Sequence, residues 1–324
     1  MPVMNIIEAV NSALHIAMEK DPTTVVFGED VGFFGGVFRA TVGLQDKFGE
    51  ARCFDTPICE QGIIGFALGC ALNGLNPIPE IQFADYMFPA YDQLHNEVAK
   101  SRYRSGGHYP CAMTIRTPYG GGIHGGHYHS QSPEAQYLHT PGIKVVMPSD
   151  PYEAKGLLLA SIRTPDPIIF FEPKRIYRAS KAEVPEEDYE IPLGVAKVVR
   201  EGRDLTLVGW GAQHQQNIRA AEAAAKEGID VEVIDLRTLN PVDVETISTS
   251  VQKTGKCVVA QEAPKTMGFA AEICALIMER CFLHLEAPVH RCAGFDTPFS
   301  NAHEHDYMPD MKRVLHSIRQ TAKY

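Results

Sequence analysis

A carboxylate stands at the entry to a predicted helix that is apolar and spaced with glycines. Residues 55–69 read DTPICEQGIIGFALG, in which Glu60 precedes Gly62, Gly65 and Gly69. Glycines at this spacing allow a flat ligand or another backbone to come close. A carboxyl group in such partly desolvated surroundings can exchange protons near neutral pH. The alternative is an acid in the first helical turn that only favours the helix dipole, and the spacing leaves both interpretations open.

A glycine-rich loop with three histidines is the second candidate for chemistry. Residues 119–134 read YGGGIHGGHYHSQSPE and contain His124, His127 and His129. A flexible loop can order over a ligand, and a histidine can donate a proton near neutral pH. The spacing H-x-x-H-x-H is also compatible with zinc, although no H-E-x-x-H motif or nearby carboxylate supports it. A third interpretation is an exposed loop whose histidines have no role.

The third candidate lies where a predicted strand passes into a turn, in EIQFADYMFPAYDQ. Ligands of parallel sheets gather at the carboxyl ends of the strands, so Gln82, Phe83 and Tyr86 are placed to meet one. Aromatic residues at this spacing are, however, more often part of a core. No G-x-x-x-x-G-K-[ST] motif occurs in the chain, so direct ATP binding through a phosphate loop is not expected.

The elements that would position these residues predict an α/β fold with parallel sheets. Apolar runs typical of strands lie near residues 23–28, 77–83, 112–118, 144–149 and 167–173. Helical patterns separate most of them, at residues 60–74, 89–104 and 151–164. Strands that are apolar throughout and alternate with helices indicate a parallel sheet covered on both faces. A further helix before them carries one apolar face made of Ile6, Ile7, Val10, Leu14, Ala17 and Met18.

We predict two domains joined by a linker. The chain has 324 residues, and a domain usually takes about 100 to 200. The first predicted domain covers residues 1–177, and the linker covers 178–195, where the sequence becomes polar, acidic and interrupted by prolines. The second covers 196–324, where the alternation resumes with helices that end at Gly228 and Gly255.

Composition excludes several classes of partner. The formal net charge is -10, which would repel phosphate backbones and anionic lipids, so no nucleic acid is expected. No run of 18 apolar residues exists, and Glu8 and Asn11 interrupt the N-terminal segment where a secretory signal needs apolar residues, so no membrane is expected. The eight cysteines include no C-x-x-C pair and are expected to be buried and reduced.

Taken together, these segments resemble the beta subunits of thiamine-diphosphate-dependent 2-oxo acid dehydrogenases, above all the branched-chain type. Similar segments run in order along nearly the whole chain: GEDVGFFGGVFRATVGL, FDTPICEQGIIG, EIQFADYMFPAYDQ, SRYRSGG, YHSQSPEA, PGIKVV, FFEPKRIYR, EVIDLRTLNP and GFDTPF. The resemblance implies a transketolase-like pyrimidine-binding domain followed by a transketolase C-terminal-like domain. It also implies oxidative decarboxylation of a branched-chain 2-oxo acid and transfer of the acyl group to a lipoyl group.

The resemblance also implies a role for each candidate residue. Glu60 resembles the glutamate that hydrogen-bonds the pyrimidine ring of thiamine diphosphate and favours its imino form. His129 resembles the loop histidine that handles protons during decarboxylation and lipoyl acylation. The implied cofactor-lining residues are Glu29, Ile58, Cys59, Glu60, Gln82 and Tyr86, and the implied substrate-side residues are Phe83, Ala84, Asp85, Tyr86 and His129. A potassium ion is implied at main-chain carbonyls of Met113, Thr114, Ser161 and Asp166.

The chain lacks the Gly-Asp-Gly segment that anchors magnesium and the diphosphate in thiamine enzymes. The resemblance therefore implies an alpha subunit that holds both, in an alpha2beta2 heterotetramer docked on a lipoyl-bearing acyltransferase core. The isolated chain is then expected to be inactive. The expected compartment is the cytoplasm for a bacterial chain and the mitochondrial matrix for a processed eukaryotic one.

Three alternatives remain open at this stage. Pyruvate and acetoin dehydrogenases use very similar beta subunits, and one or two methylenes change discrimination in an apolar pocket by only ~1 to 3 kcal/mol. FADYMFPAYDQ and SRYRSGG are more similar to the branched-chain type. A catalytically silent docking subunit would be expected to lack Glu60 or His129, and this chain has both. A one-chain transketolase-like enzyme is disfavoured because the segment for the diphosphate is absent.

Overall fold

In the computed structural model, which describes all 324 residues, the chain forms two compact units. The first unit contains residues 1–119 and 136–193, and the second contains residues 120–135 and 194–324. This division differs from the predicted domain boundaries in two places. The glycine-rich loop belongs to the second unit, and most of the predicted linker belongs to the first.

A parallel sheet forms the centre of the first unit, as predicted. Six strands lie in the order β6-β7-β5-β4-β2-β3, and neighbouring strands run parallel. They are β2 (Thr24–Gly28), β3 (Cys53–Asp55), β4 (Asn76–Glu80), β5 (Met113–Tyr119), β6 (Lys144–Val146) and β7 (Pro167–Pro173). The strand predicted to reach Phe83 is shorter: β4 ends at Glu80, and after Ile81 has donated to the Arg116 carbonyl the chain turns into a 3-10 helix.

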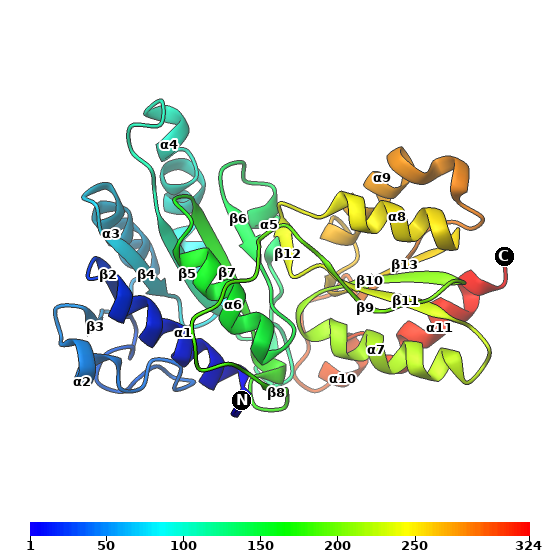
Figure 1. The fold of residues 1–324 in the computed structure, drawn as a ribbon, viewed down its shortest axis with the longest axis horizontal. Helices are drawn as coiled ribbons and strands as arrows, with labels where there is room; N and C mark the ends of the chain where they lie inside the picture. Colours follow the sequence, from blue (N-terminus) through cyan, green and yellow to red (C-terminus); the bar gives the residue numbers. More distant parts are fainter. The chain divides into compact units, whose positions relative to one another are not determined.

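The helices of the first unit are α1 (Ile6–Lys20), α2 (Leu44–Phe48), α3 (Glu60–Leu72), α4 (Ser101–Arg104) and α6 (Pro151–Ile162), with the irregular helices η1 (Ala84–Ala90), η2 (Gln93–Val98) and η4 (Lys174–Ile176). Helix α5 (Glu134–Leu138) begins in the second unit and ends in the first. Side-chain caps begin α1 and α6. The helix predicted over residues 89–104 is broken into 3-10, π and α turns, and Pro89, which lacks a backbone N–H, lies where the break begins. Figure 1 shows α1 and α6 side by side.

The predicted apolar face of α1 is confirmed, since all six residues expected on it are buried. A capping box begins the helix: the Asn5 side chain accepts from the Glu8 N–H at 3.0 Å, and the Glu8 carboxylate accepts from the Asn5 N–H at 2.7 Å. Residues 3–5 form strand β1 (Val3–Asn5), which pairs antiparallel with β8 (Lys181–Glu183). The predicted linker therefore begins as part of a folded strand pair.

The second unit is a smaller α/β layer structure. Its five strands lie in the order β14-β13-β10-β11-β9, and only β9 is antiparallel to its neighbour. They are β9 (Lys197–Arg200), β10 (Leu205–Gly209), β11 (Val231–Asp235), β13 (Cys257–Pro264) and β14 (His290–Gly294), and the remaining elements are η3 (Gly126–Tyr128), β12 (Thr238–Asn240), η5 (Phe282–His284) and α10 (Glu304–Tyr307). In Figure 1, α7 (Gly211–Ala225) and α11 (Met311–Ala322) lie along one side of this sheet, and α8 (Val244–Thr254) and α9 (Phe269–Cys281) along the other.

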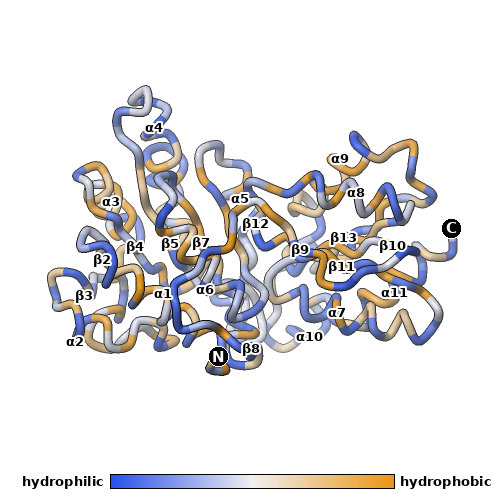
Figure 2. Tube along the Cα trace, in the orientation of Figure 1, coloured by the Kyte–Doolittle hydropathy of each residue, from blue (hydrophilic) through white to orange (hydrophobic).

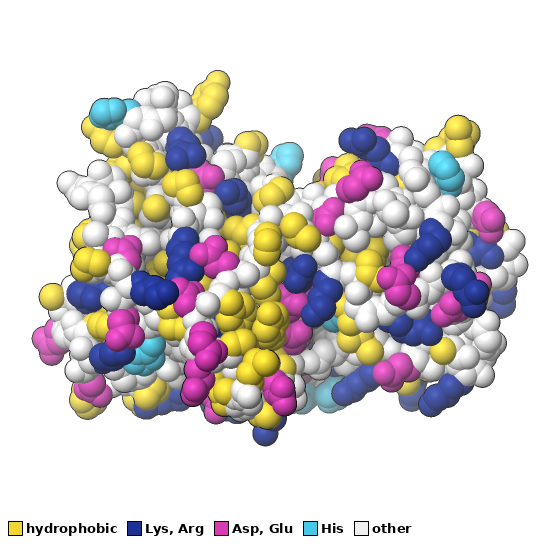
Figure 3. Space-filling view, in the orientation of Figure 1, with side chains coloured by type: hydrophobic (Ala, Val, Ile, Leu, Met, Phe, Trp, Pro, Cys, Tyr) yellow, Lys and Arg dark blue, Asp and Glu magenta, His cyan; other side chains and the backbone are white.

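The distribution of apolar and charged residues fits this layering. Figure 2 shows the hydrophobic run of β7 inside the first unit, where all seven strand residues are buried. On the face drawn in Figure 3, Lys and Arg side chains are mixed with Asp and Glu side chains and form no patch of one sign. None of the helices combines the length and the hydropathy that crossing a bilayer requires. All cysteines are free and most are buried, but Cys59 is exposed, contrary to the expectation for the group.

Candidate functional site

The carboxyl ends of β2 and β4 bring several acidic residues together in the first unit. Glu29 follows β2, Glu80 ends β4, and Glu60 begins α3. The Glu29 side chain is buried and its Oε1 atom has no hydrogen-bond partner. Burial, together with the negative charges of Glu60, Asp30 and Glu80, raises the pKa of Glu29 to about 7. We call Glu29 and Glu60 the open acid pair, because the negative charge of Glu60 contributes to the raised pKa of Glu29 and the Glu29 Oε1 atom has no hydrogen-bond partner.

Glu60 occupies the first turn of α3, so it does interact with the helix dipole. The charge of Glu60 also raises the pKa of Glu29. An acid that only favours the helix dipole would not be expected to act on a second buried acid. Glu60 itself is half-buried, while Ile58 and Cys59, which precede it, are exposed. The two predicted cofactor-lining residues are therefore accessible beside the carboxyl group.

Helix α3 presents an uncovered glycine face. A Cβ atom at Gly65 or Gly69 would meet no heavy atom within 4 Å, and Phe66 is 52% exposed between them. The helix is also apolar on nearly every side, which is typical of helices that are buried in a larger structure. A second surface can approach this face closely.

Of the residues predicted around β4, Gln82 lies next to the acids. Its Nε2 atom donates to Asp30 Oδ2 at 3.2 Å. Phe83 is buried, with its ring 5.6 Å from that of Phe38, which agrees with the alternative that this aromatic belongs to a core. The remaining predicted substrate-side residues of this unit are Ala84 and Asp85, both buried, and Tyr86, which is half-buried.

Glu80 also belongs to a buried ion cluster that the sequence did not predict. Arg116 Nη1 lies 2.8 Å from Glu80 Oε2, and its Nε lies 2.7 Å from Glu172 Oε1. Tyr177 donates its hydroxyl hydrogen to Glu172 Oε2 at 2.6 Å. We call these four residues the closed cluster, because all are buried and the charges are paired with one another. The available signal was a charge inside three apolar strand runs, at Glu80, Arg116 and Glu172.

The glycine-rich loop belongs to the second unit. His129 follows the short helix η3 and is half-buried, whereas His127 and Tyr128 just before it are exposed. His124 faces Glu304 and the ring of His305 rather than the other two loop histidines. No group of three or more His, Cys, Asp or Glu side chains in the structure is arranged to hold a metal ion.

The residues predicted to hold potassium lie around the amino ends of β5 and β7. They are Met113, Thr114, Ser161 and Asp166. Met113 is in register with Pro167, directly after Asp166, while Ser161 lies in the last turn of α6. The Asp166 carboxylate forms ion pairs with Lys144 at 3.0 Å and Arg102 at 2.9 Å. Its carboxylate is thus engaged with two cations, and the carbonyl ligation remains a prediction.

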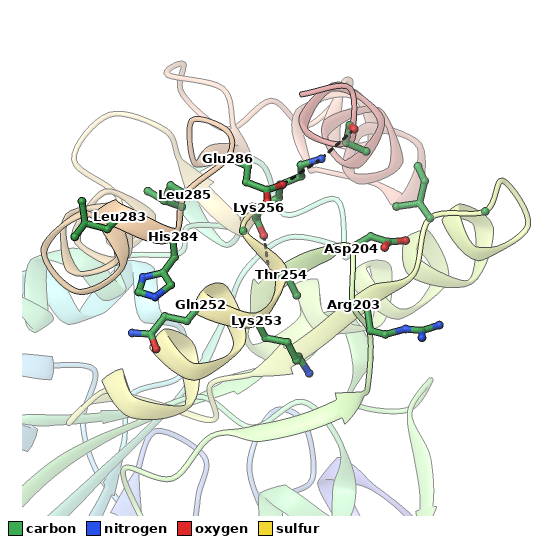
Figure 4. Close-up of a pocket in the computed structure, with 14 residues that line it drawn as sticks. Arg203, Asp204, Gln252, Lys253, Thr254, Lys256, Leu283, His284, Leu285 and Glu286 are labelled. Atoms are coloured by element: carbon green, nitrogen blue, oxygen red, sulfur yellow. Dashed lines mark hydrogen bonds and ion pairs between the residues drawn. The ribbon is translucent and has the colours of Figure 1, made fainter.

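A separate hollow of about 690 Å³ lies in the second unit, at the amino ends of β10 and β13 (Figure 4). Lys253 and Lys256 line it, but each already has a carboxylate partner: Glu232 for Lys253 and Glu286 for Lys256. Ligands of parallel sheets gather at the opposite, carboxyl edge. We therefore assign no function to this hollow.

Comparison with known proteins places these features in a family. The transketolase pyrimidine binding domain matches residues 3–180, and the transketolase C-terminal domain matches residues 194–314. The mitochondrial 2-oxoisovalerate dehydrogenase subunit beta of Dictyostelium discoideum is 61% identical over 99% of this chain and 87% of its own length. The pyruvate dehydrogenase E1 component subunit beta of Acholeplasma laidlawii is 52% identical over 100% of this chain and 99% of its own.

A solved structure described as a split gene transketolase, inactive beta4 tetramer, is similar with a TM-score of 0.80. It covers 99% of this chain and 98% of its own, at 22% sequence identity. At this identity the likeness concerns the fold alone.

Proposed function

This chain belongs to the family of 2-oxo acid dehydrogenase beta subunits, and we propose that it serves a dehydrogenase of branched-chain 2-oxo acids. The observation that carries the proposal is the open acid pair, Glu29 and Glu60, at the carboxyl ends of the strands of a transketolase-type pyrimidine-binding domain. A catalytically silent docking subunit would have no need of a buried acid whose pKa lies near 7.

The family depends on thiamine diphosphate, and the residues around α3 fit its pyrimidine part. Glu29 Oε1 is a buried polar atom without a partner, which a ligand donor would satisfy. Glu60 offers a carboxyl group to a ring nitrogen, while Ile58, Cys59 and Tyr86 offer exposed or half-exposed surface beside it. When bound, the cofactor supplies the carbon nucleophile and the electron sink for decarboxylation.

We assign the proton handling to this chain's own residues. Glu60 holds a proton at the pyrimidine nitrogen, and Glu29 keeps the charge of the pair adjustable near neutral pH. Gln82 orients Asp30, which is one of the charges acting on Glu29. His129 is the proposed proton carrier during acyl transfer to a lipoyl group, and residues 83–86 are proposed to line the substrate side.

The partner in this proposal is an alpha subunit that completes an alpha2beta2 heterotetramer. Two features support it: the chain has no Gly-Asp-Gly segment, and α3 has an uncovered glycine face around Phe66. The alpha subunit would hold magnesium and the diphosphate, and the assembly would dock on a lipoyl-bearing acyltransferase core. We propose potassium at the carbonyls of Met113, Thr114, Ser161 and Asp166. We propose the mitochondrial matrix or the bacterial cytoplasm as its compartment, according to its source.

Pyruvate is the second candidate substrate, because a pyruvate dehydrogenase subunit is similar over the full chain. Co-expression with the cognate alpha subunit, followed by decarboxylation assays, tests the choice. We expect kcat/KM for 3-methyl-2-oxobutanoate to exceed that for pyruvate by about tenfold or more, since the difference in apolar surface contributes ~1 to 3 kcal/mol. A higher kcat/KM for pyruvate or acetoin would contradict the branched-chain assignment.

A further inference from the structure

The entry of the glycine-rich loop is built around one carboxylate. The N–H of Gly121 donates to Glu262 Oε1 at 2.6 Å, and Glu262 is 4% exposed. Gly120 has φ +84°, and a Cβ atom there would lie 2.6 Å from the same oxygen. Any side chain at Gly120 would therefore displace Glu262 from the backbone that it holds.

The C-terminal end of the glycine-rich loop, residues 131–135, returns to its beginning at Gly120. Burial and the charge of Glu262 raise the pKa of Glu134 to about 8, although a hydrogen bond with Trp210 acts in the opposite direction. The Glu134 side chain is buried, at 1% exposed. The Gly120 N–H also donates to the Gln131 carbonyl at 2.9 Å, which closes the base of the loop.

The middle of the loop is attached to α10. Glu304 Oε2 accepts from the His124 N–H at 3.1 Å, and the Glu304 side chain is fully buried. His124 adopts φ +55°, which is uncommon for a residue other than glycine and needs support from its surroundings. The hydrogen bond with Glu304 provides that support.

We propose that Glu262 and Glu304 together form a carboxylate clamp that holds the loop in one shape, and that Glu304 is the positioning residue for His129. The second part rests on the proposed function of His129. His129 lies between His124, whose N–H donates to Glu304, and Gln131, whose carbonyl accepts from the Gly120 N–H. These buried anchors on both sides of His129 define where the loop runs.

The second oxygen of Glu304 has no such bond. Glu304 Oε1 is buried without a hydrogen-bond partner, and His124 Nδ1 lies 4.0 Å from it and 3.5 Å from the Asn301 carbonyl oxygen. The contact of Glu304 with the loop therefore rests on the hydrogen bond that its Oε2 atom accepts from the His124 N–H.

Hydrogen exchange measured by mass spectrometry on the complex with the alpha subunit tests the clamp. Glu304→Ala removes both acceptors, and amides of residues 121–131 should exchange about tenfold faster, the effect expected for a lost hydrogen bond to a charged group. Glu304→Gln keeps an acceptor oxygen and should restore most of the protection. Glu222→Ala, at an exposed position of α7, should change nothing. Unchanged exchange of residues 121–131 in Glu304→Ala would overturn the clamp.

Kinetics of the same variants test the positioning role. We expect Glu304→Ala to lower kcat for lipoyl acylation about tenfold, while the affinity for thiamine diphosphate changes less than about twofold. Faster loop exchange with unchanged kcat would overturn the positioning of His129. His129→Ala is measured in parallel: if it leaves kcat unchanged, the proposed role of His129 fails, whereas the exchange experiment still decides whether the clamp exists.

Discussion

The open acid pair and the closed cluster occupy neighbouring positions in the first unit, but they solve the problem of buried charge differently. In the closed cluster, Arg116 compensates Glu80 and Glu172, and every charge has a partner. In the open acid pair, Glu29 is buried beside like charges, and its pKa rises to about 7 instead. Paired charges hold the backbone in place, whereas a buried acid without a partner can bind a proton or a ligand donor. The two together put a reactive group on a rigid base.

The largest expected effect comes from removing the alpha subunit, which should affect the open acid pair but not the closed cluster. The closed cluster is complete within this chain, so the fold should persist without the alpha subunit. The open acid pair is proposed to be one half of a shared site, so the isolated chain should show no measurable decarboxylation and only weak binding of thiamine diphosphate. Titration calorimetry and a decarboxylation assay on the purified chain check this. Tight magnesium-dependent binding by the chain alone would show that the site is not shared.

Breaking the closed cluster should cost stability. Arg116→Leu leaves Glu80 and Glu172 as uncompensated buried charges, and we expect the free energy of unfolding to fall by about 3 to 5 kcal/mol. Urea denaturation measures this. Arg203→Leu, at a side chain 85% exposed, is the control and should change stability by about 0.5 kcal/mol or less. An equal loss of stability at both positions would mean that pairing the buried charges contributes no more to stability than an exposed ion pair.

Changing the open acid pair should instead cost activity. Glu60→Gln keeps the size of the side chain but removes the carboxyl group, and kcat of the reconstituted enzyme should fall by roughly 10² or more. The affinity for thiamine diphosphate should change much less, and the stability of the chain should stay close to that of the wild type. Near-normal kcat in Glu60→Gln would favour the interpretation of Glu60 as a helix-dipole acid.

The smallest effect concerns stability and pH at Glu29. Its pKa is raised from 4.5 to about 7 in the folded chain, so its contribution to stability is fully present below pH 4.5 and is lost as the pH rises through 7. Glu29→Gln removes this dependence and should be more stable than the wild type at pH 8 by roughly 1 to 3 kcal/mol. Urea denaturation between pH 5 and 8 measures the difference. Glu50→Gln, at an exposed position, should show none.

Local patterns in the sequence predicted most of the fold. The periodicity of α1 and the apolar runs of β2, β5 and β7 specify their elements, because each is decided by neighbours close in sequence. The predicted end of β4 was wrong, because the apolar run continues to Phe83 whereas the strand ends at Glu80. Glu60 was marked by its position before a glycine-spaced apolar helix, and the resemblance added its proposed role. Glu29 was found only through the resemblance, since nothing local marks it as an acid of unusual pKa.

The parts that the sequence did not predict depend on contacts between distant residues. Arg116 meets Glu172 across 56 positions, and within its own strand it only interrupts an apolar run. Gly121 and Glu262 are 141 positions apart, and His124 and Glu304 are 180 apart. A pattern that is read along the chain contains no information on such pairs. The assignment of the glycine-rich loop to the second unit follows from these same contacts.

The pairing of β1 with β8 has a consequence for the way in which this chain is synthesised. Val3 pairs with Glu183, so the first strand has no partner until about 180 further residues have been made. At a synthesis rate of about 5 to 20 residues per second, that delay is roughly 10 to 35 seconds. Helix α1 packs on α6 (Pro151–Ile162), which is also made long after it, so the hydrophobic stripe of α1 leaves the ribosome before this partner exists. The N-terminal segment is therefore synthesised well before the two elements that cover it.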